Sequence, residues 1–157
     1  LKVPASSPEL VTRMAHLAEE PTGAPLDVYE KPASTFVASF IGAPAMNLLP
    51  TTALSGHVLP GDVPRPSGAS TLGFRPEDAV LSGSGAPNSP SGGGLSLEAT
   101  VEGVEPVGAE SFVYCRANGE RLVLRAPGRT SAQAGDGLSV AVDAAKLHWF
   151  GADGRRL

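Results

Sequence analysis

Beyond Met46 the hydrophobic residues of this chain fall in short alternating runs, and glycine or proline separates one run from the next. Alternation with a period of two places hydrophobic side chains on one face of a β-strand. The 157 residues include 19 Gly and 15 Pro, which favour many turns over long helices. Seven strands are predicted, at residues 71–74, 79–81, 95–104, 111–117, 121–126, 138–142 and 144–150. We therefore expect a mainly β fold, a small five-stranded barrel of the oligonucleotide/oligosaccharide-binding (OB) type.

The clearest local signal is a hairpin predicted at Asn118-Gly119. A two-residue type I′ turn needs positive φ at both central positions, which asparagine and glycine tolerate best. In the strand after this turn Leu122 and Leu124 alternate with Val123, which places the two leucines on one face. Asp153-Gly154 predicts a second, weaker hairpin turn near the C-terminus.

Before Met46 the hydrophobic period is helical. One helix is predicted within residues 1–22, and a short helical turn over residues 26–29 ends before Pro32. Another helix has its start marked by Ser34 or the nearby Pro32 and its end by Gly42, with an apolar face of Phe36, Val37, Phe40 and Ile41. We interpret it as a docking helix at a domain border. The chain is accordingly divided into residues 1–45 and a β domain at residues 46–157.

Composition and charge exclude several kinds of function. The net charge of −4 gives no electrostatic footprint for nucleic acid. Cys115 is the single cysteine, so neither an internal disulfide nor a multi-cysteine zinc site is possible, and its alternating run predicts a structural role. His16, His57 and His148 share no metal-ligand spacing. No catalytic residue, cofactor site or metal site is therefore predicted in this chain.

Acidic pairs and glycine runs form no catalytic pattern either. Neighbours such as Glu77-Asp78 point to opposite faces of a strand, so we interpret them as charged surface positions. A phosphate-binding loop needs a lysine and a hydroxyl directly after its last glycine, where a helix begins. In "SGGGLSLEA" Leu95 stands at the lysine position and a strand pattern follows. We therefore predict no nucleotide-binding loop.

No membrane segment is visible in the sequence. Spanning a bilayer takes about 20 consecutive apolar residues, and no run approaches that length. The chain also does not begin with the basic and apolar regions of a signal peptide. We expect a soluble cytoplasmic protein without direct membrane insertion.

Three segments carry a more specific signal. Residues 23–50 read "GAPLDVYEKPASTFVASFIGAPAMNLLP", residues 72–81 read "LGFRPEDAVL", and the chain ends in "LHWFGADGRRL". In this order they resemble three segments of the ATP-binding subunits of sugar-type ABC importers, those for glycerol-3-phosphate and maltose included. The first is the crossover from the nucleotide-binding domain into the accessory domain, the second is the regulatory-domain motif L-G-x-R-P-E, and the third is the terminal strand pair. The residues that match the crossover pattern are Gly23, Pro25, Tyr29, Pro32, Phe36, Val37, Ala38, Phe40, Ile41, Gly42, Met46 and Asn47.

The resemblance implies that residues 1–45 hold the end of a nucleotide-binding domain with a linker, and residues 46–157 an OB-fold-like accessory domain of the TOBE type. It implies a role in regulation and dimerisation, with a second ATP-binding subunit and, indirectly, the membrane permease subunits as partners at the inner face of a bacterial plasma membrane. ATP and Mg serve the parent family, but the Walker A loop, Q-loop, signature motif, Walker B aspartate and switch histidine would lie upstream. The implied interface residues are Phe36, Phe40, Ile41, Asn47, Arg75, Pro76 and Glu77.

Two departures from the family pattern lead to further expectations. Residues 1–22 do not resemble what precedes Gly23 in the family, and the interval between Asn47 and Arg75 looks shorter than usual. We therefore expect a fragment or rearranged gene product in which one or two barrel strands are missing or replaced. Two alternatives stay open: a free-standing β-barrel that binds a small anion or sugar, and a truncated product without a function of its own.

Overall fold

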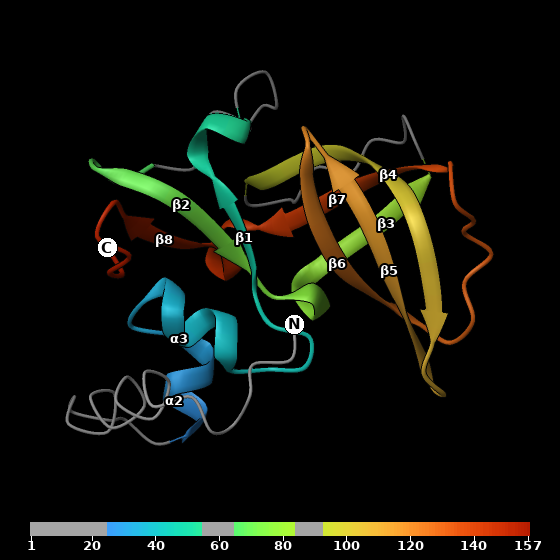
Figure 1. The fold of residues 1–157 in the computed structure, drawn as a ribbon, viewed down its shortest axis with the longest axis horizontal. Coiled ribbons are helices and arrows are strands. Elements are labelled where there is room, and N and C mark those ends of the chain that lie inside the picture. The colour runs from blue at the N-terminus through green and yellow to red at the C-terminus, as the bar shows by residue number, and fades with distance from the viewer. Residues whose placement is uncertain (1–24, 55–64, 84–92) are drawn as a thin grey trace, which may run out of the picture.

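The structure, a computed structural model, describes residues 25–54, 65–83 and 93–157, and these form two antiparallel β-sheets with two short helices beside them (Figure 1). The helices are α2 (Pro25–Glu30) and α3 (Thr35–Phe40). The helix predicted within residues 1–22, His16 and His57 lie outside the described residues. The strands are β1 (Asn47–Pro50), β2 (Ala69–Phe74), β3 (Ala79–Gly83), β4 (Gly94–Pro106), β5 (Glu110–Ala117), β6 (Glu120–Pro127), β7 (Gly137–Asp143) and β8 (His148–Gly151).

The smaller sheet has the strand order β1-β2-β8 and joins the two ends of the β domain. Its central strand β2 pairs with both neighbours, so that Gly73 lies opposite Leu48 on β1 and His148 on β8. A Cβ atom added at Gly73 would lie 2.6 Å from Met46 Sδ and 3.1 Å from Phe150 Cε2. The glycine of the "LGFRPE" segment is therefore required by close packing, not by an unusual backbone conformation.

The larger sheet has the order β3-β7-β4-β5-β6 and rolls up around the long strand β4. The first half of β4 pairs with β7 and the second half with β5, and a register shift between Val101 and Gly103 marks the bend. The outer strands β3 and β6 contact each other, but in the described part of the chain no hydrogen-bonded ladder joins them. The predicted mainly β, OB-fold-like architecture is confirmed, as a rolled sheet without a closed ladder.

One hydrophobic core lies between the two sheets. Leu72 and Phe74 enter it from β2, and Leu122 and Leu124 enter it from β6. All four side chains are at most 1% exposed, so the alternation seen in the sequence does separate inner from outer positions. The core is therefore common to both sheets and holds them together as one unit.

The predicted hairpin between β5 and β6 turns at Asn118 and Gly119, with φ of 49° and 80°. We expect Gly119→Val to lower the free energy of unfolding by about 1–2 kcal/mol, because a β-branched residue is strained at positive φ. Urea denaturation would measure the change. The control is Arg121→Val, which also introduces valine but in the adjoining strand, at a position with ordinary φ. An equal loss of stability in both variants would contradict this explanation.

The structure corrects the predicted strands in three places. Strand β1 was missed, since "NLLP" offers too short a run to show alternation. The interval between Asn47 and Arg75 holds β1, the 3-10 turn η1 (Thr51–Leu54) and β2, so two strands of the smaller sheet are present there. The predicted strand at residues 144–150 begins instead with the 3-10 turn η3 (Ala144–Lys146), and only β8 is extended. The described residues thus form eight strands, of which five make the rolled sheet.

The predicted docking helix is also corrected. Ser34 does cap it, since its hydroxyl accepts a hydrogen bond from the Val37 amide at 3.2 Å. However, α3 ends at Phe40, and Ile41 has an extended backbone. The buried residues of α3 are Val37 and Ala38, so the expected single face that includes Phe40 and Ile41 does not exist. Phe36 and Phe40 do share one side of α3, but Ile41 cannot continue it because it lies beyond the end of the helix.

Candidate functional site: the junction between the helices and the β domain

Helix α3 packs against the smaller sheet through a small hydrophobic cluster of its own. Ala38 and Phe150 are fully buried and Met46 is 5% exposed in this cluster, which lies apart from the main core. On the other side of α3 the rings of Phe36 and Phe40 stack with centroids 4.8 Å apart. Phe40 is 38% and Ile41 37% exposed. The junction therefore presents an aromatic and aliphatic surface outward while α3 is anchored inward.

The beginning of α3 is fastened to the C-terminal residues of the chain. The Thr35 amide donates to the Gly154 carbonyl and the Arg156 amide donates to the Ala33 carbonyl, both at 2.9 Å. Arg156 in turn forms a β-bridge with Phe150 on β8. Residues 33–35 and 154–156 thus extend the smaller sheet beyond β8 and tie the helices to it. The turn at Asp153-Gly154 that allows this pairing was predicted, and Gly154 has φ of 80°.

The end of α3 and the end of α2 meet at Arg75. This side chain is 2% exposed and follows β2 directly. Its Nη2 donates to the Tyr29 carbonyl at 2.8 Å, its Nη1 donates to the Ile41 carbonyl, and its guanidinium lies 4.0 Å from the centroid of the Tyr29 ring. Glu77 accepts a hydrogen bond from the Tyr29 hydroxyl. The 3-10 turn η2 (Pro76–Asp78) begins at the buried Pro76 and places Glu77 close to Arg75, so that both contact Tyr29.

Burial and neighbouring charges shift the pKa values around Arg75. Burial lowers the pKa of Arg75, while the nearby Tyr29, Glu77 and Asp78 act in the opposite direction. Burial and the hydrogen bond to Glu77 raise the pKa of Tyr29, so the phenol stays protonated and donates. Arginine is effectively always charged, so Arg75 does not lose its proton on burial. Carbonyl oxygens and the face of the Tyr29 ring stabilise the buried cation instead.

Asn47 joins the two sheets at the opposite side of the junction. Its Nδ2 donates to the Val123 carbonyl and its Oδ1 accepts from the Val123 amide, each at 2.8 Å. The side-chain amide of Asn47 therefore makes the two hydrogen bonds that a neighbouring strand would otherwise make at the outer edge of β6. At the turn between β5 and β6, the Asn118 side chain donates to the Ala53 carbonyl in η1 at 2.5 Å. The segment from β1 to η1 is thereby fixed along β6.

The structure brings together three of the sequence-predicted interface residues, Ile41, Arg75 and Glu77, around a fourth residue, Tyr29. Phe36 and Phe40 form a separate ring pair on the outward side, and Asn47 lies toward β6. Tyr29 was not among the predicted candidates. Its place in the crossover pattern could have indicated it, whereas the role of Val123 as partner of Asn47 has no signal in the sequence, because its contribution is made by backbone atoms.

Cys115 and His148 are buried structural residues. Burial raises the pKa of the Cys115 thiol to about 11, which makes it a poor nucleophile. His148 accepts a hydrogen bond at Nδ1 from Arg156 Nη1 over 2.8 Å, so its ring is neutral. Burial, with Arg156, Arg75 and Lys146 nearby, lowers the pKa of His148 to about 4.

The buried His148 predicts a loss of stability in acid. The folded-state pKa of about 4 lies below the ordinary 6.5, so the unfolded chain binds more protons between these values. The free energy of unfolding should therefore fall as the pH drops from 6.5 to 4, by about 2 kcal/mol once solvent screening is allowed for, with no further loss from this group at lower pH. Urea denaturation across this range measures it. His148→Gln keeps an acceptor for Arg156 and should flatten the profile; an unchanged slope would contradict the assignment.

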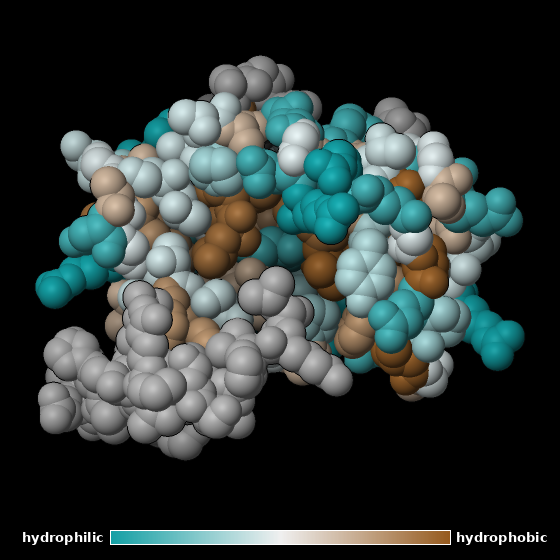
Figure 2. Space-filling view, viewed as in Figure 1, coloured by the Kyte–Doolittle hydropathy of each residue, from teal (hydrophilic) through white to brown (hydrophobic). Residues whose placement is uncertain are grey.

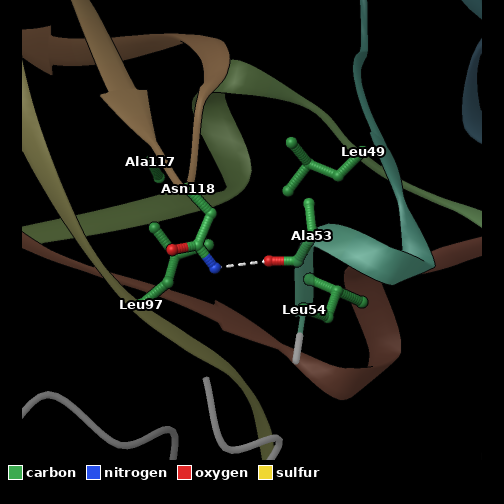
Figure 3. A pocket seen from close by; sticks show the side chains of 6 residues that line it. All are labelled: Leu49, Ala53, Leu54, Leu97, Ala117 and Asn118. Carbon is green, nitrogen blue, oxygen red and sulfur yellow. Dashed lines mark hydrogen bonds between the residues drawn. The ribbon is translucent and has the colours of Figure 1, made fainter. Parts of the chain in front are cut away.

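A small hollow lies beside the hairpin, lined by Leu49, Ala53, Leu54, Leu97, Ala117 and Asn118 (Figure 3). Its open space is about 10 Å³, about enough for one water molecule. Figure 3 shows the leucine side chains around it and the Asn118 amide directed at the Ala53 carbonyl. A sugar or an oxyanion does not fit, so this hollow gives no support to a small-ligand site.

In residues 25–54, 65–83 and 93–157 no group of three or more His, Cys, Asp or Glu side chains is arranged to hold a metal ion. Within the same ranges, no helix combines the length and the hydrophobicity needed to cross a membrane.

On the face seen in Figure 2, hydrophobic residues form separate small patches between hydrophilic ones. Much of the outer face of the hairpin is occupied by paired charges and polar groups. Arg125 lies 3.2 Å from Glu110, and Tyr114 donates to Glu105 at 2.8 Å. The junction around Phe40 and Ile41 is therefore the better candidate for an interaction surface.

The chain is similar to a known domain family and to several known proteins. The model of the TOBE domain family matches residues 72–150. The chain is 46% identical over 152 residues to the sn-glycerol-3-phosphate import ATP-binding protein UgpC of Rhodopseudomonas palustris (strain BisA53), covering 87% of this chain and 40% of that protein. It is 43% identical over 140 residues to UgpC of Rhizobium meliloti (strain 1021), covering 88% of this chain and 39% of the relative.

Among solved structures, the molybdate-bound form of the cytoplasmic molybdate-binding protein ModG matches with a TM-score of 0.43 and 13% identity, over 49% of this chain and 57% of that one. The chain spans about two fifths of the length of the curated relatives it matches.

Proposed function

This chain belongs to the TOBE domain family, and from that membership we propose that it is the regulatory and dimerisation part of the ATP-binding subunit of an ABC importer. The observation that carries the proposal is the identity of 40–46% to sn-glycerol-3-phosphate import ATP-binding proteins across most of the chain. The proposed solute of the parent transporter is glycerol-3-phosphate or a related carbohydrate. In this proposal the chain itself performs no chemistry, and ATP and Mg are bound by another part of the parent subunit.

The junction supports this role physically. Here α3 is held at its beginning by residues 154–156 and at its end by Arg75, so a displacement of α3 would act on the β domain. Phe40 and Ile41 remain exposed on the far side of α3. We propose that the ATP-binding part of the subunit covers them. The partners would be a second ATP-binding subunit and, through it, the permease subunits at the cytoplasmic face of the membrane.

The proposal is tested in a chimera. Residues 23–157 of this chain would replace the matching C-terminal part of the Rhodopseudomonas palustris relative, in a strain that lacks its own copy. We expect the chimera to restore ATP-dependent uptake of glycerol-3-phosphate, whereas the relative truncated at the same point should not. A chimera that folds and hydrolyses ATP, but supports no more uptake than the truncated protein, would contradict the proposal.

In the isolated chain the exposed junction should promote self-association. Two large apolar side chains in contact with water favour association through the burial of apolar surface. We expect sedimentation velocity at micromolar concentration to show dimers or larger species, and Phe40→Ser with Ile41→Ser to shift the chain toward monomer. Val107→Ser removes an apolar residue of similar exposure, 41%, at another place and should leave the distribution unchanged. A monomeric wild-type chain would contradict this expectation.

A further inference from the structure

We propose that Arg75 is the positioning residue that locks α2 and α3 onto the β domain, so that the two parts move as one body. The residue belongs to the β domain, since it links β2 to η2. Its contacts reach across to the ends of both helices, Tyr29 in the last turn of α2 and Ile41 at the C-cap of α3. One side chain therefore connects three elements.

The placement of the cation suits both helix ends. The last carbonyl groups of a helix have no partner within the helix and carry partial negative charge. Through Nη2 the guanidinium donates to one such carbonyl, that of Tyr29 in α2, and through Nη1 it donates to the carbonyl of Ile41, the residue that follows α3. Helices of six residues are too short to be stable without external contacts. The two helix ends thus depend on a group supplied by the β domain.

The backbone around Arg75 is shaped to admit the guanidinium. Gly42 has φ of 112°, and a Cβ atom there would lie 2.9 Å from Arg75 Nη1 and 3.4 Å from Tyr29 Cε2. The guanidinium carbon lies over the Tyr29 ring, 4.0 Å from its centroid, while Nη1 and Nη2 donate to the carbonyl groups of Ile41 and Tyr29. A lysine ammonium carries the charge but has neither the planar fork nor the stacking face. The site is therefore specific for arginine.

Arg75 has a task that the other attachment of α3 does not perform. Residues 154–156 hold the beginning of α3 at Ala33 and Thr35, far along the helix from Ile41. Without Arg75, α3 would stay attached at its beginning and through Ala38, and α2 through the Tyr29 hydroxyl, but the carbonyl groups of Tyr29 and Ile41 would lose the guanidinium that joins them to β2. If the proposed function holds, Arg75 is the residue through which a movement of the ATP-binding part reaches the TOBE domain. That consequence rests on the proposed function, whereas the lock itself does not.

The lock is tested on the 157-residue chain by backbone ¹⁵N relaxation. Rigid amides have order parameters near 0.85 and flexible ones fall below about 0.6. In the wild type we expect the Lys31 and Ile41 amides, which close the last turns of α2 and α3, to be as rigid as those of β4 and β7. In Arg75→Met both should fall below about 0.6 while the strands keep their values, and Arg75→Lys should give intermediate values.

Arg125→Met is the matched control. Arg125 is also a half-buried arginine that donates to the crossover segment, at the Ala43 carbonyl over 3.4 Å, but it does not reach the helix ends. It should leave Lys31 and Ile41 rigid. Three outcomes would each overturn the proposal. The order parameters could stay unchanged in Arg75→Met, or the helices could already be flexible in the wild type. The loss of order in Arg75→Lys could also extend equally through β4 and β7. These outcomes are independent of the uptake test, so either proposal can fail alone.

Discussion

Phe150→Ala is expected to lower the free energy of unfolding by about 3–5 kcal/mol, the usual cost of truncating a fully buried aromatic side chain. Phe150 is 0% exposed and forms the small cluster with Ala38 and Met46 that holds α3 on the smaller sheet. The cavity would open between the helices and the β domain, so both would lose packing. Because stable domains have only about 5–15 kcal/mol in total, this single change should remove a large part of the stability.

Urea denaturation followed by fluorescence of Trp149, the single tryptophan of the chain, measures the effect. Phe40→Ala is the matched control, because it makes the same substitution at a side chain that is 38% exposed and whose ring lies tilted against that of Phe36. We expect it to cost less than about 1 kcal/mol. If the two variants lost equal stability, the packing of α3 on the smaller sheet would not contribute as the structure indicates.

Asn47→Ala should cost about 2–5 kcal/mol, because it leaves both the amide and the carbonyl of Val123 without their partner. Each buried backbone group left unpaired costs about 1–3 kcal/mol. Asn47→Asp is the more informative variant. Its carboxylate can still accept from the Val123 amide, but it cannot donate to the Val123 carbonyl. At neutral pH it should therefore destabilise the domain about as much as alanine does.

Acid should partly rescue Asn47→Asp, because a protonated carboxyl group can donate to the carbonyl. Since the folded state favours the protonated form, the pKa of the new carboxyl should rise above its ordinary value, and the difference from the wild type should shrink as the pH falls. Gln133→Glu makes the same change of amide to acid at an exposed position and should show no such recovery. A pH-independent difference for Asn47→Asp would refute the two-bond arrangement.

Local patterns predicted most of the β domain correctly. The strands that alternate clearly over five or more residues, from β4 to β7, lie where the sequence placed them, because alternation is decided by which neighbours face the core. The hairpin at Asn118 was equally local, since positive φ at two positions is a property of the residues themselves. The family resemblance was carried by equally local segments and is confirmed by the match to the TOBE domain.

The candidate site could be predicted as a set of residues but not as an arrangement. The resemblance indicated Ile41, Asn47, Arg75 and Glu77, and nothing in their spacing says that Arg75 reaches Ile41 while Asn47 reaches Val123. The extent of α3 was also misjudged, because a six-residue helix takes its boundaries from the contacts at its two ends. Besides the local cap by Ser34, those contacts include hydrogen bonds to distant residues, from Arg75 to the Ile41 carbonyl and from the Thr35 amide to the Gly154 carbonyl.

By itself, the sequence determined the secondary structure of the strongly patterned segments and the family. Only the tertiary structure decided the two-sheet arrangement with β1 in it, the pairing of residues 33–35 with 154–156, and the position of a buried arginine at two helix ends. The physical reason is the range of the interactions. Backbone preference and side-chain alternation act between neighbours, whereas hydrogen bonds to backbone carbonyls and close packing at Gly73 depend on segments that meet only after folding.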